Sequence, residues 1–172
     1  MYNKTFILAW VMAFALCFSP LLRVAAAQTP SRLQQFQAWG TYSYRADGKS
    51  LCYALSVPLV ADPANVRHGD NFFLLSKKSG TQAGFEPQLA AGYDLKEGAP
   101  VVVRIGEKRF SFFSRGSVAW LASVNDEKQL VALMRSGATM DVSATSKRGT
   151  QTHYVFSLKG VSAALNALNN CK

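Results

Sequence analysis

The stretch that decides the fold is VVVRIGEKRFSFFS, residues 101–114. Its two halves, 101–105 and 109–114, are rich in β-branched and aromatic residues. The segment between them is Gly106-Glu107-Lys108, and a short glycine-containing link between two such runs is typical of a β-hairpin. The stretch therefore predicts two adjacent antiparallel strands.

Aromatic residues of this hairpin indicate which face is buried. Successive side chains of a strand point to opposite faces, so Phe110 and Phe112 share one face while Phe113 points to the other. We expect Trp39, Trp120 and the phenylalanines to lie mainly in the core.

Outward from this hairpin, the chain shows a regular succession of short strand-like segments and turns, with no alternation of strands and helices. Asp-Gly within Ala46–Lys49 predicts a second hairpin, and Ser146-Lys147-Arg148-Gly149 a third. Residues 58–70 and 79–85 are predicted to be loops. The other strand-like segments are 39–45, 50–57, 71–78, 86–95, 117–123, 139–145 and 151–158. About eight short strands of this kind predict an all-β protein, a two-sheet sandwich with one or two small helices over its ends.

Two short helices are predicted late in the chain. Asn125 is expected to cap a helix that starts at Asp126 and Glu127, because acidic residues in a first turn suit the helix dipole. Gly137 is expected to end this helix. Residues 160–169 form a weakly amphipathic closing helix.

The amino-terminal 27 residues have the layout of a secretory signal peptide. An apolar run, Phe6–Phe18, is followed by Ala25-Ala26-Ala27, a cleavage site of the A-x-A type. The run is shorter than the ~20 residues of a membrane-spanning helix; an uncleaved signal anchor is the alternative. The sequence thus predicts an exported protein with a signal peptide at 1–27, a flexible arm at 28–38 and one β-sandwich domain at 39–172.

Cleavage changes the charge and the cysteine count. It lowers the formal net charge from +9 to +7 and removes Cys17. The two remaining cysteines, Cys52 and Cys171, form an even pair, which in an exported chain predicts a disulfide. Two free thiols are the alternative.

Recognised catalytic and metal-binding patterns are missing from the sequence. Its hydrophobic content of 49% and charged content of 17% exclude a disordered chain. His68 and His153 are its two histidines, and neither belongs to a cluster of metal ligands. No G-x-S-x-G motif occurs. We therefore expect no enzyme, no cofactor and no metal; an unrecognised periplasmic hydrolase is an alternative.

Basic residues gather in the predicted turns. Lys108, Arg109, Lys147 and Arg148 are candidates for binding a polyanion such as lipopolysaccharide or an acidic glycan. The alternative is that they are solvated hairpin tips that keep the sheet edges soluble. Export argues against an intracellular nucleic acid as the partner.

Several motifs along the mature chain carry a family resemblance. They are Trp39-Gly40, Leu51-Cys52-Tyr53, KEGAPV at 96–101, KRFSFF at 108–113, Ala119-Trp120-Leu121, SKRGT at 146–150 and SLKGVSAAL at 157–165. In this order and spacing, over about residues 36–171, the chain resembles the invasion-associated locus B family of exported bacterial envelope proteins. The resemblance implies an immunoglobulin-like β-sandwich that is periplasmic, attached to the outer membrane or secreted. The family namesake is linked to host-cell invasion, and the resemblance supplies no catalytic residues.

The sequence thus favours an exported, non-enzymatic protein that binds an envelope or host ligand. Polyanion binding through the basic hairpin tips is the second hypothesis, and the unrecognised hydrolase is the third.

Overall fold

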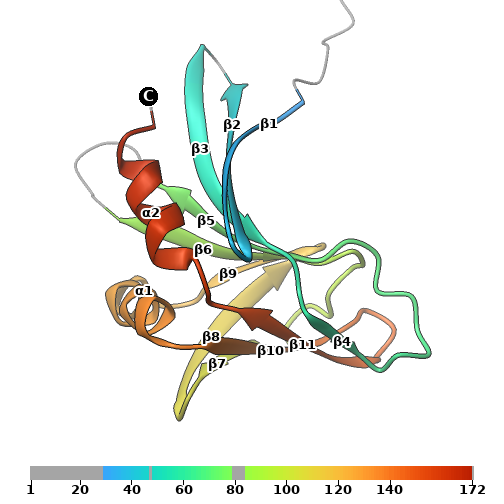
Figure 1. The fold of residues 1–172 in the computed structure, drawn as a ribbon. Helices are drawn as coiled ribbons and strands as arrows, with labels where there is room; N and C mark the ends of the chain where they lie inside the picture. Colours follow the sequence, from blue (N-terminus) through green and yellow to red (C-terminus); the bar gives the residue numbers. More distant parts are fainter. Residues whose placement is uncertain (1–28, 47, 79–83, 172) are drawn as a thin grey trace, which may run out of the picture.

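The computed structural model describes residues 29–46, 48–78 and 84–171. Outside the described residues lie the predicted leader (1–27), Asp47 of the predicted turn and residues 79–83 of a predicted loop. Figure 1 shows the chain as β-strands with two short helices. The strands are β1 (Ser31–Phe36), β2 (Trp39–Ala46), β3 (Lys49–Ser56), β4 (Val60–Asp62), β5 (Phe72–Lys77), β6 (Phe85–Ala90), β7 (Val101–Ile105), β8 (Lys108–Arg115), β9 (Val118–Leu121), β10 (Thr139–Thr145) and β11 (Gln151–Ser157); the helices are α1 (Glu127–Ser136) and α2 (Val161–Asn169).

Eleven strands of the described residues form one antiparallel sheet in the order β1-β2-β3-β5-β6-β9-β8-β7-β10-β11-β4. The predicted hairpins β7–β8 and β10–β11 are both present, and Val103 pairs with Phe110 in the first of them. Neighbouring strands along the chain mostly pair with each other, because short turns favour antiparallel pairing.

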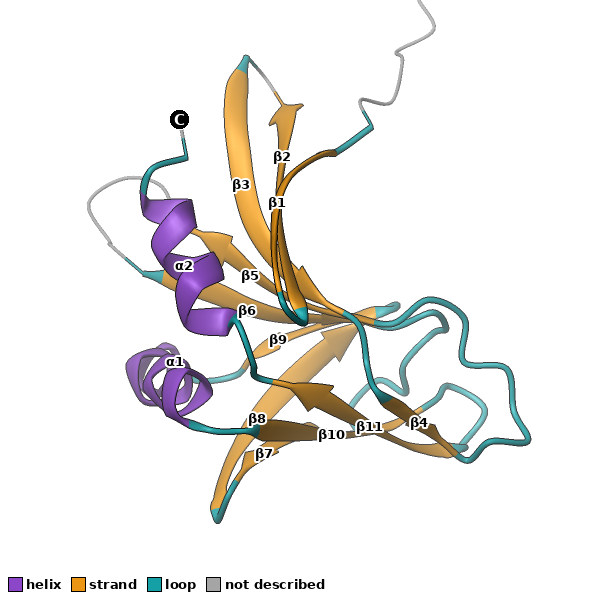
Figure 2. Ribbon diagram, in the orientation of Figure 1, coloured by secondary structure: helices purple, strands orange, loops and turns teal. Residues whose placement is uncertain are grey.

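The sheet folds over so that its two halves face each other, as Figures 1 and 2 show. The ring of Phe73 on β5 lies 6.0 Å from that of Phe112 on β8 and 5.9 Å from that of Phe156 on β11, measured between centroids. These strands are far apart in the sheet order, so the rings meet across the core and not along one face. The predicted all-β sandwich with two small helices is confirmed; its two layers are halves of one hydrogen-bonded sheet.

Of the ten tryptophan and phenylalanine residues predicted for the core and lying within the described part of the chain, half are buried, four are half-buried and Phe113 is exposed. Trp39 is fully buried, and its Nε1 donates a hydrogen bond to the carbonyl oxygen of Ser157 at 2.9 Å. Phe113 is 55% exposed, as strand alternation predicts, and Trp120 is half-buried and stacks on it. The prediction that Trp120 lies in the core is wrong, because its strand position faces outward beside Phe113.

Two segments that the sequence predicts as irregular are strands. Residues 31–36, predicted as part of a flexible arm, form β1 and pair with β2. Residues 60–62, within the predicted loop 58–70, form β4 and pair with β11. Both are edge strands whose side chains are mostly exposed, so they lack the apolar alternation that reveals a strand in sequence.

Helix α1 starts differently from the prediction. Asn125 belongs to a 3₁₀ turn at Val124–Asp126, and α1 begins at Glu127 without a side-chain cap. The Glu127 carboxylate is buried; it accepts a hydrogen bond from the backbone N–H of Phe85 at 2.8 Å and pairs with Lys78. Asn125 is therefore not the cap, and Glu127 ties the helix to the start of β6. Gly137 ends the helix as predicted.

Helix α2 closes the fold over β1, β2 and β3. Just beyond it, Cys171 forms a disulfide with Cys52 of β3, with the two Cα atoms 6.3 Å apart across 119 positions of sequence. This is the pairing expected from the cysteine count. None of the helices in the described part of the chain is long and apolar enough to cross a membrane.

Candidate functional site

The four basic residues singled out in the sequence lie at two ends of the sheet. Lys108 and Arg109 follow the turn at the end of β7, whereas Lys147 and Arg148 lie in the turn after β10. Strands β7 and β10 are antiparallel, with Arg104 opposite Asp141. The end of β7 therefore lies beside the start of β10, and the two basic turns point in opposite directions. One polyanion patch containing all four residues does not form.

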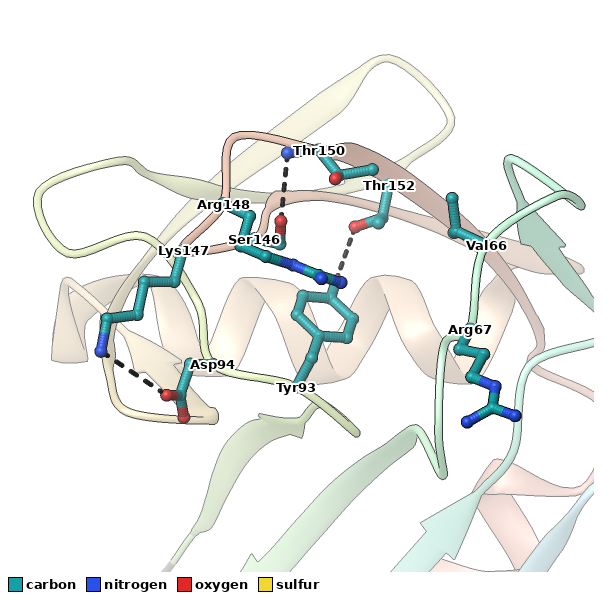
Figure 3. A pocket seen from close by; sticks show the side chains of 9 residues that line it. All are labelled: Val66, Arg67, Tyr93, Asp94, Ser146, Lys147, Arg148, Thr150 and Thr152. Atoms are coloured by element: carbon teal, nitrogen blue, oxygen red, sulfur yellow. Dashed lines mark hydrogen bonds and ion pairs between the residues drawn. The ribbon is translucent and has the colours of Figure 1, made fainter.

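Lys147 and Arg148 line a surface cavity of about 320 Å³, which we call the basic pocket. Arg67 joins them from the loop 63–70, which is more than 75 positions earlier in the chain. Figure 3 shows Tyr93 between Lys147 and Arg67. The residues that line the pocket are Val66, Arg67, Tyr93, Asp94, Ser146, Lys147, Arg148, Thr150 and Thr152. Arg67 could not be found from the sequence, since no local pattern links it to the β10–β11 turn.

The first wall of the pocket is the β10–β11 turn, which backbone hydrogen bonds hold in place. The Ser146 N–H donates to the carbonyl oxygen of Thr150 at 2.8 Å, and the Thr150 N–H donates to Ser146 Oγ at 3.0 Å. The Lys147 N–H donates to the carbonyl oxygen of Asp94 at 2.7 Å. Because its backbone is fixed on both sides, the turn presents Lys147 and Arg148 from a rigid base.

The second wall is the loop 63–70, which is tied to the segment carrying Tyr93. Asn71 Nδ2 donates to the carbonyl oxygens of His68 and Gly69, at 2.9 and 3.1 Å, and Asn71 Oδ1 accepts from the Gly92 N–H at 3.3 Å. His68 Nε2 lies 3.1 Å from the carbonyl oxygen of Pro63. These bonds fix the position from which Arg67 reaches the pocket.

The floor of the pocket is formed by Tyr93 and Thr152, which a chain of hydrogen-bonded side chains supports. The hydroxyl of Tyr93 lies 2.6 Å from Thr152 Oγ1, and the hydroxyl of Tyr154 donates to that of Tyr93 at 3.1 Å. His68 Nδ1 lies 2.9 Å from the Tyr154 hydroxyl. Burial, and then the hydrogen bond with Tyr93, raise the pKa of Tyr154 above its ordinary value. The Tyr154 hydroxyl therefore stays protonated at neutral pH. The chain of hydrogen bonds holds the ring of Tyr93 in one orientation.

Electrostatically, the pocket has an excess of positive charge: Arg67, Lys147 and Arg148 against the single carboxylate of Asp94. Lys147 Nζ lies 3.8 Å from Asp94 Oδ2, with the two side chains 76% and 60% exposed, so this pair is weak. Within the described residues, neither guanidinium forms an ion pair. The guanidinium groups of Arg67 and Arg148, which form no ion pair with a described residue, can each bind a phosphate or carboxylate group in bidentate fashion.

Arg109, at the other end of the sheet, lines a second cavity of about 250 Å³ on the outer face of β7, β10 and β11. There Asp141 accepts a hydrogen bond from Arg104 at 3.1 Å through Oδ2, and its Oδ1 lies 3.0 Å from His153 Nε2. Both oxygens of Asp141 are thus engaged by neighbouring strands. Sequence reasoning did not join these residues, because only the strand register places them together.

Comparison with known proteins identifies the family. A family model described as "Invasion associated locus B (IalB) protein" matches residues 43–169, which include both walls of the basic pocket. The chain belongs to the IalB family. The match confirms the resemblance drawn from the sequence motifs.

A solved structure also resembles this IalB-family chain. The crystal structure of invasion associated protein b from Bartonella henselae aligns with a TM-score of 0.60 at 16% sequence identity. The alignment covers 80% of this chain and 95% of the other. At this identity the likeness establishes a shared fold for the two IalB-type proteins. No curated protein sequence matches the chain.

Proposed function

We propose that this IalB-family chain is an exported, non-enzymatic envelope protein that binds an anionic glycan through its basic pocket. One observation carries the proposal: Arg67 and the pair Lys147–Arg148, which come from separate parts of the chain, line the same cavity. If the basic residues were only solvated hairpin tips, nothing would require an arginine from a distant loop to line the same cavity. Two rigid backbone segments support the cations, as a binding site requires.

Export and the absence of catalysis belong to the same proposal. The signal-peptide layout of residues 1–27 supports export. Within the described residues, Ser143 of the second cavity makes no side-chain hydrogen bond with His153, although the two residues pair across β10 and β11. A serine nucleophile needs such contact with its base, so this cluster supports a structural role.

The test compares two double charge reversals that change the net charge equally. Lys147→Glu with Arg148→Glu alters the basic pocket, and Lys108→Glu with Arg109→Glu alters the opposite end. Binding of purified lipopolysaccharide and of heparin is measured for the processed protein at low and at raised salt. We expect the pocket variant to lose about tenfold or more in affinity and the control to lose much less.

Equal losses in the two variants would contradict the proposal, because they would show that only overall charge matters. Binding that does not weaken as salt rises would also contradict it.

The words "invasion associated" in the family description suggest a role at the host cell for this chain too. Lipopolysaccharide stands for a bacterial source of the glycan and heparin for a host source, so the two probes separate these settings.

A further inference from the structure

We infer that the basic pocket binds one sugar residue carrying a single anionic group, not an extended stretch of polymer. This inference rests on the proposed function and specifies its ligand. The cavity of about 320 Å³ lies at the lower end of the range of small-molecule pockets. It is bounded by the β10–β11 turn on one side and by the loop 63–70 on the other, so it suits a compact ligand.

The cations supply recognition of the anionic group. Lys147 and Arg148 stand on the turn, and Arg67 stands on the loop across the pocket, with Tyr93 between Arg67 and Lys147 (Figure 3). In this view the Arg148 guanidinium lies over Tyr93, whereas Lys147 extends toward Asp94 and Arg67 points away. The long side chains of Lys147 and Arg67 must therefore turn inward for donors from both walls to surround a phosphate or a carboxylate group. Because the donors are fixed to separate walls, a ligand must fill the space between them to contact both.

Asp94 argues against a bare inorganic anion as the ligand. Its carboxylate is exposed beside Lys147, and an ionised carboxylate only accepts hydrogen bonds. It repels any phosphate group that enters the pocket, but a sugar phosphate offsets this repulsion because its sugar hydroxyl groups can donate hydrogen bonds to the carboxylate while its phosphate stays at the cations. A ligand that combines hydroxyl donors with one anionic group satisfies both Asp94 and the cations.

The remaining lining residues suit the neutral part of a sugar. Ser146 and Thr150 bring hydroxyl groups that can both donate and accept hydrogen bonds. The ring of Tyr93 is half-buried, and its hydroxyl is bonded to Thr152 and Tyr154, so the ring is held in one orientation. A fixed aromatic ring offers an apolar surface to the carbon atoms of a sugar.

The test uses four small probes: glucose 6-phosphate, glucuronate, glucose and inorganic phosphate. Binding to the processed protein is followed by NMR from the backbone amide signals of Ser146 and Thr150. We expect glucose 6-phosphate or glucuronate to bind about tenfold more tightly than glucose and inorganic phosphate. The better of the two acidic sugars identifies the anionic group. Equal binding of the acidic sugars and inorganic phosphate would overturn the inference.

A substitution at Asp94 provides the second readout. Asp94→Asn is expected to reduce the preference for the acidic sugar over inorganic phosphate, because phosphate is no longer repelled and sugar hydroxyls lose a charged acceptor. Glu107→Gln, in the exposed β7–β8 turn, removes the same charge at the other end of the sheet and should leave the preference unchanged. An unchanged preference in Asp94→Asn would overturn the inference.

The proposed function and the single-sugar inference can fail separately. If heparin or lipopolysaccharide binds through Lys147 and Arg148 but no small acidic sugar shifts the pocket amides, the proposed function stands and the single-sugar inference fails. If none of these ligands responds to the charge reversal at Lys147 and Arg148, the proposed function itself fails.

Discussion

Gly69 and Gly92 bring two segments of the basic pocket into direct backbone contact. A Cβ atom on Gly69 would lie 2.7 Å from the carbonyl oxygen of Gly92, closer than real Cβ atoms come. Gly69 also has φ +62°, in the left-handed region that favours glycine. The loop that carries Arg67 therefore reaches the segment that carries Tyr93 only because side chains are missing at these two positions.

Gly92→Ala is expected to push the loop 63–70 away from its neighbour and to weaken glycan binding. Overpacking of this kind costs about 1–3 kcal/mol in the free energy of unfolding. Gly106→Ala is the control: Gly106 has φ +57° with open space around it, so the substitution strains the backbone by roughly 1–2 kcal/mol but lies far from the pocket. Urea unfolding and heparin binding are measured for both. Equal binding by the two variants would show that the glycine contact does not position Arg67.

The Cys52–Cys171 disulfide is expected to contribute strongly to stability, because it closes a loop across 119 positions. From loop-closure entropy, removing the disulfide should lower the free energy of unfolding by roughly 4–5 kcal/mol. The variant Cys52→Ala with Cys171→Ala, compared with the oxidised protein by urea unfolding, measures this value. Adding reductant should destabilise the parent protein and leave the double variant unchanged. If reductant lowers the stability of both equally, the effect does not come from this bond.

Two phenylalanines on opposite faces of the sheet give a matched test of the core. Phe73 is fully buried and contacts rings on β8 and β11, so Phe73→Ala should cost about 3–5 kcal/mol in the free energy of unfolding. Phe113 is exposed and stacks on Trp120, so Phe113→Ala should cost only about 0.5–1.5 kcal/mol. Similar losses in the two variants would contradict the idea that the sheet halves pack through Phe73.

Strands that bury one face could be predicted from the sequence, and edge strands could not. The bounds of β7 and β10 agree with the predicted segments 101–105 and 139–145, because buried and exposed side chains alternate along them. In β1 the side chains are nearly all exposed, so its place in the sheet depends on backbone hydrogen bonds to β2, which the sequence does not reveal.

The candidate site was only half predictable for a similar reason. Lys147 and Arg148 are visible in the sequence as a basic pair in a turn. Arg67 lies in a loop with no local pattern, and it joins them only through the folding of the sheet. Strand register also separates Lys108 and Arg109 from the pair, and charge content alone carries no information on register.

Tyr154 links the pocket floor to the stability of the fold at high pH. Burial raises its pKa above the ordinary value of 10.0, so the folded state holds the phenolic proton more tightly than the unfolded state does. The stabilisation is fully present below about pH 10 and is lost as the pH rises toward the folded-state pKa. Tyr154→Phe should lower stability at neutral pH by about 1–3 kcal/mol, because Tyr93 and His68 lose a hydrogen-bond partner.

The same variant should lose less stability than the parent protein on going to high pH, so the difference between the two narrows above about pH 10. Part of the decline remains in the variant, because burial also raises the pKa of Tyr53. Phe156→Leu is the control: it disturbs the neighbouring core of β11 without removing an ionisable group, so its difference from the parent should stay constant with pH. Urea unfolding at a series of pH values measures all three proteins. A gap between parent and Tyr154→Phe that stays constant through this range would show that the Tyr154 proton is not linked to folding.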